Sequence, residues 1–291
     1  MTVTIADDTV SVEINGSGRF RMALHQRRDL VAAIIADGGW EAFESPMPMY
    51  YFAHLAESPG LVIDVGINTG FYAFVACLAS SLNFVLGFEP DATVREFLWQ
   101  NIGLNQLADR ISVSPVALSN RIGVAQLYIP DPGHGLIESS SSLDGSFKVR
   151  HSGVVEVNVS TLDAVLSSQI WQDQPVSAIK IDVEGHELAV LEGAASTIEK
   201  WRPLVFVEYL IEPIMACYRP SSPVSIIGMY HCRKGIWAPV EKSHSTRQHG
   251  ITPLCPPSCC ESFFSTLSDR LALKDDRRKC SQTMIGPLRT L

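Results

Sequence analysis

The stretch VIDVGINTGFYA, Val62 to Ala73, decides the fold of this chain. A short apolar run leads into a glycine turn, and apolar residues at helical spacing follow the turn. A turn of this kind can hold a nucleotide, a phosphate or a methyl donor, or it can simply reverse the chain. The residues within the turn, and those that end the later strands, distinguish these alternatives.

The turn departs from two well-known phosphate-binding patterns. In the dinucleotide pattern G-x-G-x-x-G, the second glycine lets the backbone touch a pyrophosphate and the third lets helix and strand pack closely. Here Gly66 is first, but Asn68 and Phe71 take the other two places. A P-loop needs a Lys directly after its last glycine, and none follows Gly70. Asp64 also argues against a purely structural turn, because an unpaired carboxylate in an apolar strand is costly.

After this turn, apolar runs alternate with segments of helical spacing. This alternation predicts an α/β fold with βαβ units and a mostly parallel central sheet flanked by helices. Asp91 and Thr161 are expected to cap the helices that follow them. Ligands of such sheets bind outside the carboxyl ends of the strands. Five places are expected to lie at those ends: Asp64–Gly70, Glu89–Asp91, Ala117–Asn120, Asp182–His186 and Glu208.

Three parts of the chain differ in pattern. Residues 1–49 are expected to form an accessory hairpin and a helix from about Asp29, which either packs at the edge of the fold or acts as a substrate lid. Residues 50–213 are expected to form the main domain. Residues 214–291 form an atypical tail, rich in Cys, Pro, Ser and basic residues, with a candidate strand pair (SIIGMYH and GIWAPVE) and a candidate helix (SFFSTLSDRLAL).

Composition narrows the class of partner. The 291 residues are 46% hydrophobic, which allows a sizeable core, and the formal net charge is -8. A negative chain argues against a nucleic acid as the main partner, since phosphates require a basic footprint. The first residues lack the pattern of a signal peptide, and no uncharged apolar run approaches the roughly 20 residues of a spanning helix. We therefore expect a cytoplasmic protein that binds neither nucleic acid nor membrane.

The spacing Asp64-x-Gly66-x-Asn68-x-Gly70 resembles motif I of class I methyltransferases that use S-adenosylmethionine. Small glycines would let the backbone approach this donor, and free N–H groups at the start of the next helix can face its carboxylate. Asp64 can anchor the turn or meet the donor ammonium. The second strand ends in Glu89, which can accept hydrogen bonds from both ribose hydroxyls or can favour the following helix through its dipole.

Several motifs in order resemble the FkbM-type methyltransferases: VIDVGINTGFYA, GFEPD, PVALSN, TLDAVL, IKIDVEGHELAVLEGA and PLVFVE, with the loop SSSSL before TLD. The resemblance implies a Rossmann-like class I methyltransferase fold, with residues 50–213 as an S-adenosylmethionine-binding domain that methylates a hydroxyl of a sugar or natural product. The residues implied for donor binding are Asp64, Gly66, Asn68, Gly70 and Glu89, with Ala117 bordering the adenine. Asp182 and Glu184 are implied at the reaction end.

The reaction implied is displacement at the sulfonium methyl by a substrate oxygen, where alignment matters most and a general base would help. The candidates for this base are Asp182, Glu184, His186 and Glu208. His186 has a suitable unperturbed pKa, although it can equally be an exposed residue at a helix start, and Glu184 can cap that helix. Asp182 and Glu208 could hold a divalent cation through oxygen ligands, but we expect no metal.

The tail raises further alternatives. Its His and Cys residues match no common zinc spacing. Its abrupt change in composition near residue 213 suggests a change of reading frame, which would leave a non-catalytic S-adenosylmethionine-binding protein with a damaged C-terminal region. A nucleotide-cofactor oxidoreductase is disfavoured by Asn68 and Phe71. The acceptor is expected to be a small hydroxylated molecule, and the sequence does not identify it, because acceptor pockets lie in variable loops.

Overall fold

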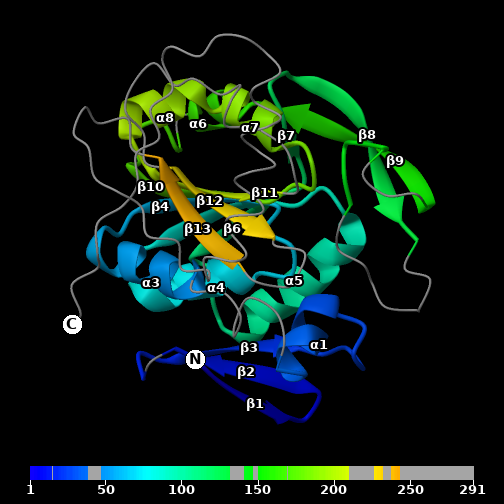
Figure 1. The fold of residues 1–291 in the computed structure, drawn as a ribbon, viewed down its shortest axis with the longest axis vertical. Coiled ribbons are helices and arrows are strands. Elements are labelled where there is room, and N and C mark those ends of the chain that lie inside the picture. Colours follow the sequence, from blue (N-terminus) through cyan, green and yellow to red (C-terminus); the bar gives the residue numbers. More distant parts are fainter. Residues whose placement is uncertain are drawn as a thin grey trace, which may run out of the picture.

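The structure is a computed structural model that describes residues 1–14, 16–38, 47–131, 141–146, 150–168, 170–209, 226–231 and 237–242. Its centre is a seven-stranded sheet with the order β13-β12-β11-β10-β4-β5-β6 (Figure 1). All neighbours pair in parallel except β13, which is antiparallel to β12. The strands are β4 (Leu61–Val65), β5 (Phe84–Phe88), β6 (Ile111–Ser114), β10 (Val176–Ile181), β11 (Leu204–Tyr209), β12 (Ile226–His231) and β13 (Trp237–Lys242). The predicted α/β, Rossmann-like fold is confirmed.

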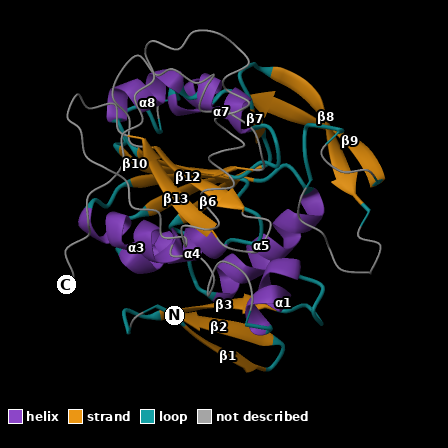
Figure 2. Ribbon diagram, viewed as in Figure 1, coloured by secondary structure: helices purple, strands orange, loops and turns teal. Residues whose placement is uncertain are grey.

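Helices cover both faces of this sheet (Figure 2). One layer holds α3 (Met47–Glu57), α4 (Phe71–Ala79) and α5 (Ala92–Leu104), and the other holds α6 (Leu162–Leu166), α7 (Glu187–Gly193) and α8 (Ala195–Trp201). Alternate side chains of a strand pack against the two helix layers. Val62 joins the core beneath α4, whereas Ile63 and Val65 join the core beneath α7. A strand buried on both faces must be apolar throughout, which explains the run LVIDV and makes Asp64 exceptional.

The N-terminal unit, residues 1–36, is a meander of β1 (Thr2–Ala6), β2 (Thr9–Glu13) and β3 (Arg19–Ala23) followed by α1 (Leu30–Ala36). The predicted hairpin of β2 and β3 and the helix start at Asp29 are confirmed, while β1 is an additional, mostly exposed strand. The inner residues of the meander join the core of α4 and α5, and the Phe20 ring lies 5.5 Å from those of Phe71 and Phe74. The unit therefore packs on the α4–α5 layer, away from α6–α8 (Figure 1).

A second three-stranded sheet lies between β6 and α6 in the chain and stands at one side of the molecule (Figure 1). It consists of β7 (Ala117–Leu118), β8 (Gly123–Pro130) and β9 (His151–Ser160), in the order β7-β9-β8. Only some of its side chains reach the interior. Leu118 and Leu127 are buried, whereas Val124 and Val154 are about half exposed.

The candidate strand pair of the tail is present as β12 and β13, which extend the sheet beyond β11. The candidate helix at 262–273 and the rest of the tail lie outside the described residues. Among the helices that the structure does describe, none has both the length and the apolar character needed to cross a bilayer.

Candidate functional site

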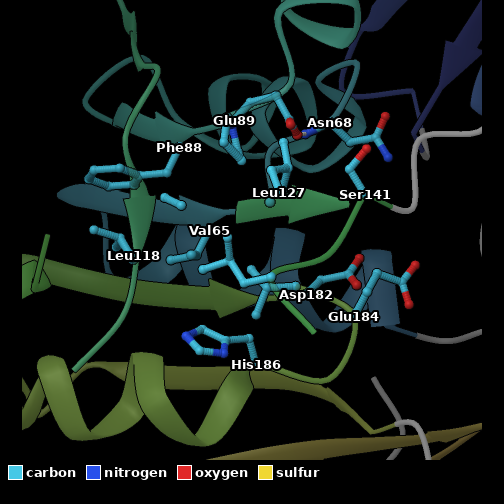
Figure 3. A pocket seen from close by; sticks show the side chains of 15 residues that line it. Val65, Asn68, Phe88, Glu89, Leu118, Leu127, Ser141, Asp182, Glu184 and His186 are labelled. Carbon is cyan, nitrogen blue, oxygen red and sulfur yellow. Dashed lines mark hydrogen bonds between the residues drawn. The ribbon is translucent and has the colours of Figure 1, made fainter. Parts of the chain in front are cut away.

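A pocket lies at the carboxyl ends of β4, β5 and β10, where ligands of parallel sheets are expected (Figure 3). The small sheet and residues 141–143 form its outer wall. Its lining consists of Val65, Gly66, Asn68, Phe88, Glu89, Pro90, Ala117, Leu118, Leu127, Ser141, Leu143, Asp182, Val183, Glu184 and His186.

The pocket brings most of the predicted site residues together. Glu89 and Asn68 lie on one side, and Asp182, Glu184 and His186 lie on the other (Figure 3). Gly66 and Ala117 also line it. Asp64 and Gly70 do not: Asp64 is buried within β4, and Gly70 occupies the N-cap position of α4. The described residues 1–38 contribute nothing to the lining.

The glycine turn, residues 66–70, needs its glycines for contacts within the protein. Gly66 has φ +76°, and a Cβ there would lie 1.9 Å from the carbonyl oxygen of Asp182. Gly70 has φ +105°, and a Cβ there would crowd Phe74 and Leu98. Their small size thus serves the close approach of β4 to the end of β10 and the packing of α4, a different reason from the predicted approach of the backbone to a donor.

Glu89 is held in the wall of the pocket by two backbone N–H groups. Its Oε2 accepts from Asn68 N at 3.2 Å, and its Oε1 accepts from Asp91 N at 2.9 Å. The side chain is almost completely buried, and burial raises the pKa of its carboxyl to about 8. The carboxyl therefore joins the glycine turn to the start of α5 and still borders the pocket.

Asp64 and Lys180 form a buried charge pair, in which the sequence predicted a role for Asp64 but none for Lys180. Neither carboxylate oxygen of Asp64 receives a hydrogen bond within the described part of the chain. Lys180 Nζ lies 3.9 Å from Asp64 Oδ1 and 3.1 Å from Asp182 Oδ2. Burial raises the pKa of Asp64 to about 7, and the Lys180 charge partly offsets this rise. The signal was a Lys in the apolar strand SAIKI, directly beside Asp64 in the sheet.

Residues 141–143 are anchored over the pocket by serine hydroxyls. Ser141 Oγ donates to Asp91 Oδ2 at 2.9 Å, and Ser142 Oγ donates to the carbonyl oxygen of Glu184 at 2.7 Å. The backbone of Ser142 also pairs with Tyr128 in β8. The serine run was recognised as part of the family pattern, but its role in lining a pocket could not be read from the chain.

His186 is a half-buried residue at the N-cap position of α7 that lines the pocket. Its Nε2 lies 3.0 Å from Ser119 Oγ, and burial lowers its pKa, which favours the neutral imidazole. Glu187 accepts the backbone N–H groups of Val183 and Gly185, and so steadies the loop before the helix. The N-cap position of α7, which we considered for Glu184, is occupied by His186.

The segment LEGA explains how Ser119 reaches His186. A Cβ at Gly193 would lie 2.0 Å from the carbonyl oxygen of Ser119, so only glycine allows α7 to approach the loop after β7 this closely. The loop thereby places the Ser119 hydroxyl beside the imidazole.

Metal binding has no support in the part of the chain that the structure describes, where no group of three His, Cys, Asp or Glu side chains could hold an ion. The side chain of Glu208, the second candidate ligand beside Asp182, lies outside that part, as do the side chains considered for zinc.

Comparisons with known proteins identify a methyltransferase family and methyltransferase relatives. The family model described as the methyltransferase FkbM domain matches residues 64–214. The methyltransferase sdnD of Sordaria araneosa is 26% identical, over 53% of this chain and 71% of its own. The hexuronic acid methyltransferase AglP of Haloferax volcanii is 27% identical, over 59% of this chain and 63% of its own.

Among solved structures, the methyltransferase FkbM from Methylobacillus flagellatus KT aligns at 17% identity with a TM-score of 0.34. That alignment covers 56% of this chain and 40% of the other. The chain thus spans less than two thirds of the length of AglP and of this structure.

Proposed function

This chain belongs to the FkbM methyltransferase family, whose model matches more than half of its 291 residues, and we propose that it methylates a hydroxyl of a small molecule with S-adenosylmethionine as donor. The observation that carries the proposal is the position of Glu89. A buried carboxyl at the end of β5, tied to the glycine turn and bordering the pocket, suits a ligand that carries a ribose diol.

The residues present fit the donor. Each Glu89 oxygen accepts one N–H and keeps a further lone pair, so the carboxylate can accept both ribose hydroxyls. Asp64 is fully buried and lies outside the pocket lining, so its predicted contact with the donor ammonium is not part of this fit. Ala117, Leu118 and Leu127 give an apolar wall that suits a flat adenine ring.

S-adenosylmethionine, when bound, supplies a methyl group that its positive sulfur has already activated. The chain then has to align a hydroxyl oxygen and accept its proton. His186 is the base we favour, because it borders the pocket and burial lowers its pKa, which favours the proton-accepting neutral imidazole. Asp182 and Glu184 lie on the same side of the pocket and can orient a hydroxylated acceptor through hydrogen bonds.

The acceptor class guides the experiment. Because AglP is a hexuronic acid methyltransferase, a panel of hydroxylated acceptors should contain hexuronic acids and their glycosides beside other sugars and polyketide-like alcohols. The purified protein is incubated with S-adenosylmethionine, and S-adenosylhomocysteine and methylated product are measured by mass spectrometry. Product formation that is lost in His186→Gln supports the proposal.

A non-catalytic donor-binding protein is the main competing function. It would bind S-adenosylmethionine with the same pocket and give no product with any acceptor. Methylation of nitrogen or carbon in an acceptor, with hydroxyls untouched, would contradict the proposed reaction.

A further inference from the structure

Asp29 is an unusual helix cap. Its Oδ1 accepts the backbone N–H of Ala32 at 3.0 Å and so caps α1, yet only 1% of the residue is exposed. A capping carboxylate on a surface helix ordinarily stays hydrated, since burying a charge is unfavourable. Burial accordingly raises the pKa of Asp29 to about 6. Capping alone does not require a buried carboxyl. Asp29 also makes a second contact, with the glycine turn.

Thr69 makes that contact. Its Oγ1 donates to Asp29 Oδ1 at 3.3 Å, and its backbone N–H is accepted by Asn68 Oδ1 at 2.7 Å. Asn68 in turn gives its own backbone N–H to Glu89. A continuous path of hydrogen bonds therefore runs from the N-terminal unit through the turn to the carboxyl that borders the pocket.

Asn101 of α5 holds Thr69 from a second direction. This side chain is fully buried, its Nδ2 donates to the carbonyl oxygen of Thr69 at 3.0 Å, and its Oδ1 accepts from Ala23 N at 2.8 Å. Ala23 ends β3. The N-terminal unit thus reaches the hydroxyl of Thr69 through Asp29 and the carbonyl of Thr69 through Asn101.

The glycine turn has an unusual backbone conformation. Gly66, Asn68 and Gly70 all have positive φ, with 55° at Asn68. Glycine adopts this conformation freely and Asn adopts it more readily than most residues, so these residue types suit the turn. The contacts of Asp29 and Asn101 act on Thr69, in the middle of this turn.

We propose that Asp29 is a positioning residue for the donor, acting through the Thr69 hydroxyl, so that the N-terminal unit belongs functionally to the donor site although none of its described residues lines the pocket. The inference rests on the proposed function, because its readout is affinity for S-adenosylmethionine. It also replaces the two alternatives for the N-terminal unit, a lid or edge packing, with a third: a support behind the glycine turn.

Three variants separate positioning from simple stability. Thr69→Val removes the hydroxyl and keeps the shape of the side chain. Asp29→Ser keeps a good helix cap but is too short to reach Thr69. The control is Asn83→Ala. Asn83 is fully buried and makes hydrogen bonds to three backbone groups. It precedes β5 and therefore lies at the amino ends of the strands, whereas the pocket lies at their carboxyl ends.

Calorimetric titration with S-adenosylmethionine should show affinity about 3- to 10-fold weaker in Thr69→Val and in Asp29→Ser. The double variant should be no weaker than Thr69→Val alone, because Asp29 acts through the Thr69 hydroxyl. Asn83→Ala should lower the melting temperature and leave the affinity unchanged. Asp29→Asn, which keeps an acceptor at the position of Oδ1, should retain affinity.

Amide hydrogen exchange gives a readout that does not need the donor. Peptides covering residues 66–70 should exchange faster in Thr69→Val than in Asn83→Ala. Unchanged affinity and unchanged exchange in Thr69→Val and Asp29→Ser would overturn this inference alone, provided that the wild-type protein binds S-adenosylmethionine. Absence of binding by the wild-type protein would overturn the proposed function and this inference with it.

Discussion

Glu89 is expected to release a proton when S-adenosylmethionine binds. Burial raises the pKa of the free carboxyl to about 8, so it is mostly protonated at pH 7. Ribose hydroxyls that donate to this group favour its ionised form, and binding must then expel the proton. From a pKa of about 8, about 0.9 of a proton leaves per site at pH 7 and about 0.5 at pH 8.

The same linkage fixes the sign of the pH dependence. Affinity for S-adenosylmethionine should be highest and nearly constant above about pH 9, where the free carboxyl is already ionised, and should fall by up to about tenfold for each pH unit below pH 8. Asp64, whose pKa is raised to about 7, can release a further fraction below pH 8. Measurements at pH 8 therefore report mainly on Glu89.

Titration calorimetry at pH 8 in buffers of different ionisation enthalpy counts the protons released. Glu89→Gln removes the titrating group and should remove most of the release, whatever affinity remains, while Asp64→Asn should retain it. Donor binding without proton release in the wild-type protein, with an affinity that is flat between pH 6.5 and 9, would refute the assignment of Glu89 to the ribose.

Other substitutions test the remaining features. His186→Gln should lower the rate of methyl transfer about 100-fold or more and leave donor affinity unchanged, and a rate that stays within twofold would exclude His186 as the base. Gly66→Ala should destabilise the fold by more than about 2 kcal/mol in thermal denaturation, because its Cβ would overlap the carbonyl of Asp182. Phe20→Ala should cost about 3–5 kcal/mol in urea denaturation, and a much smaller loss would mean that the N-terminal unit is only loosely attached. Lys180→Met should raise the pKa of Asp64 further, since the ammonium favours the carboxylate, and carbon-13 NMR of the labelled carboxyl measures this shift.

The sequence predicted the features that depend on local pattern. The run LVIDV is a strand because it is buried on both faces, and Asp91 and Thr161 cap their helices through backbone N–H groups two or three residues away. Glu89 was found because a carboxyl after the second strand has a clear place in this topology. The strand and the caps follow from residue type and spacing along the chain, and Glu89 follows from its place at a strand end together with the resemblance to motif I.

Contacts between distant segments could not be predicted in the same way. Three such contacts depend on how close the backbones come after folding. They are the contacts of Gly66 with Asp182, of Gly193 with Ser119 and of Thr69 with Asp29. Lys180 carried a signal, a cation in an apolar strand, but its partner Asp64 is a neighbour only in the sheet. The sequence alone therefore does not predict which residues pair across the sheet or pack between its layers.

The central claim is that the pocket at the ends of β4, β5 and β10 binds S-adenosylmethionine through Glu89. Equilibrium dialysis with labelled S-adenosylmethionine and with NAD, on the wild-type protein and on Glu89→Ala, tests it most directly. We predict one bound S-adenosylmethionine per chain, no bound NAD, and a loss of binding of at least tenfold in Glu89→Ala. Equal binding by both proteins, or NAD bound in place of S-adenosylmethionine, would contradict the account.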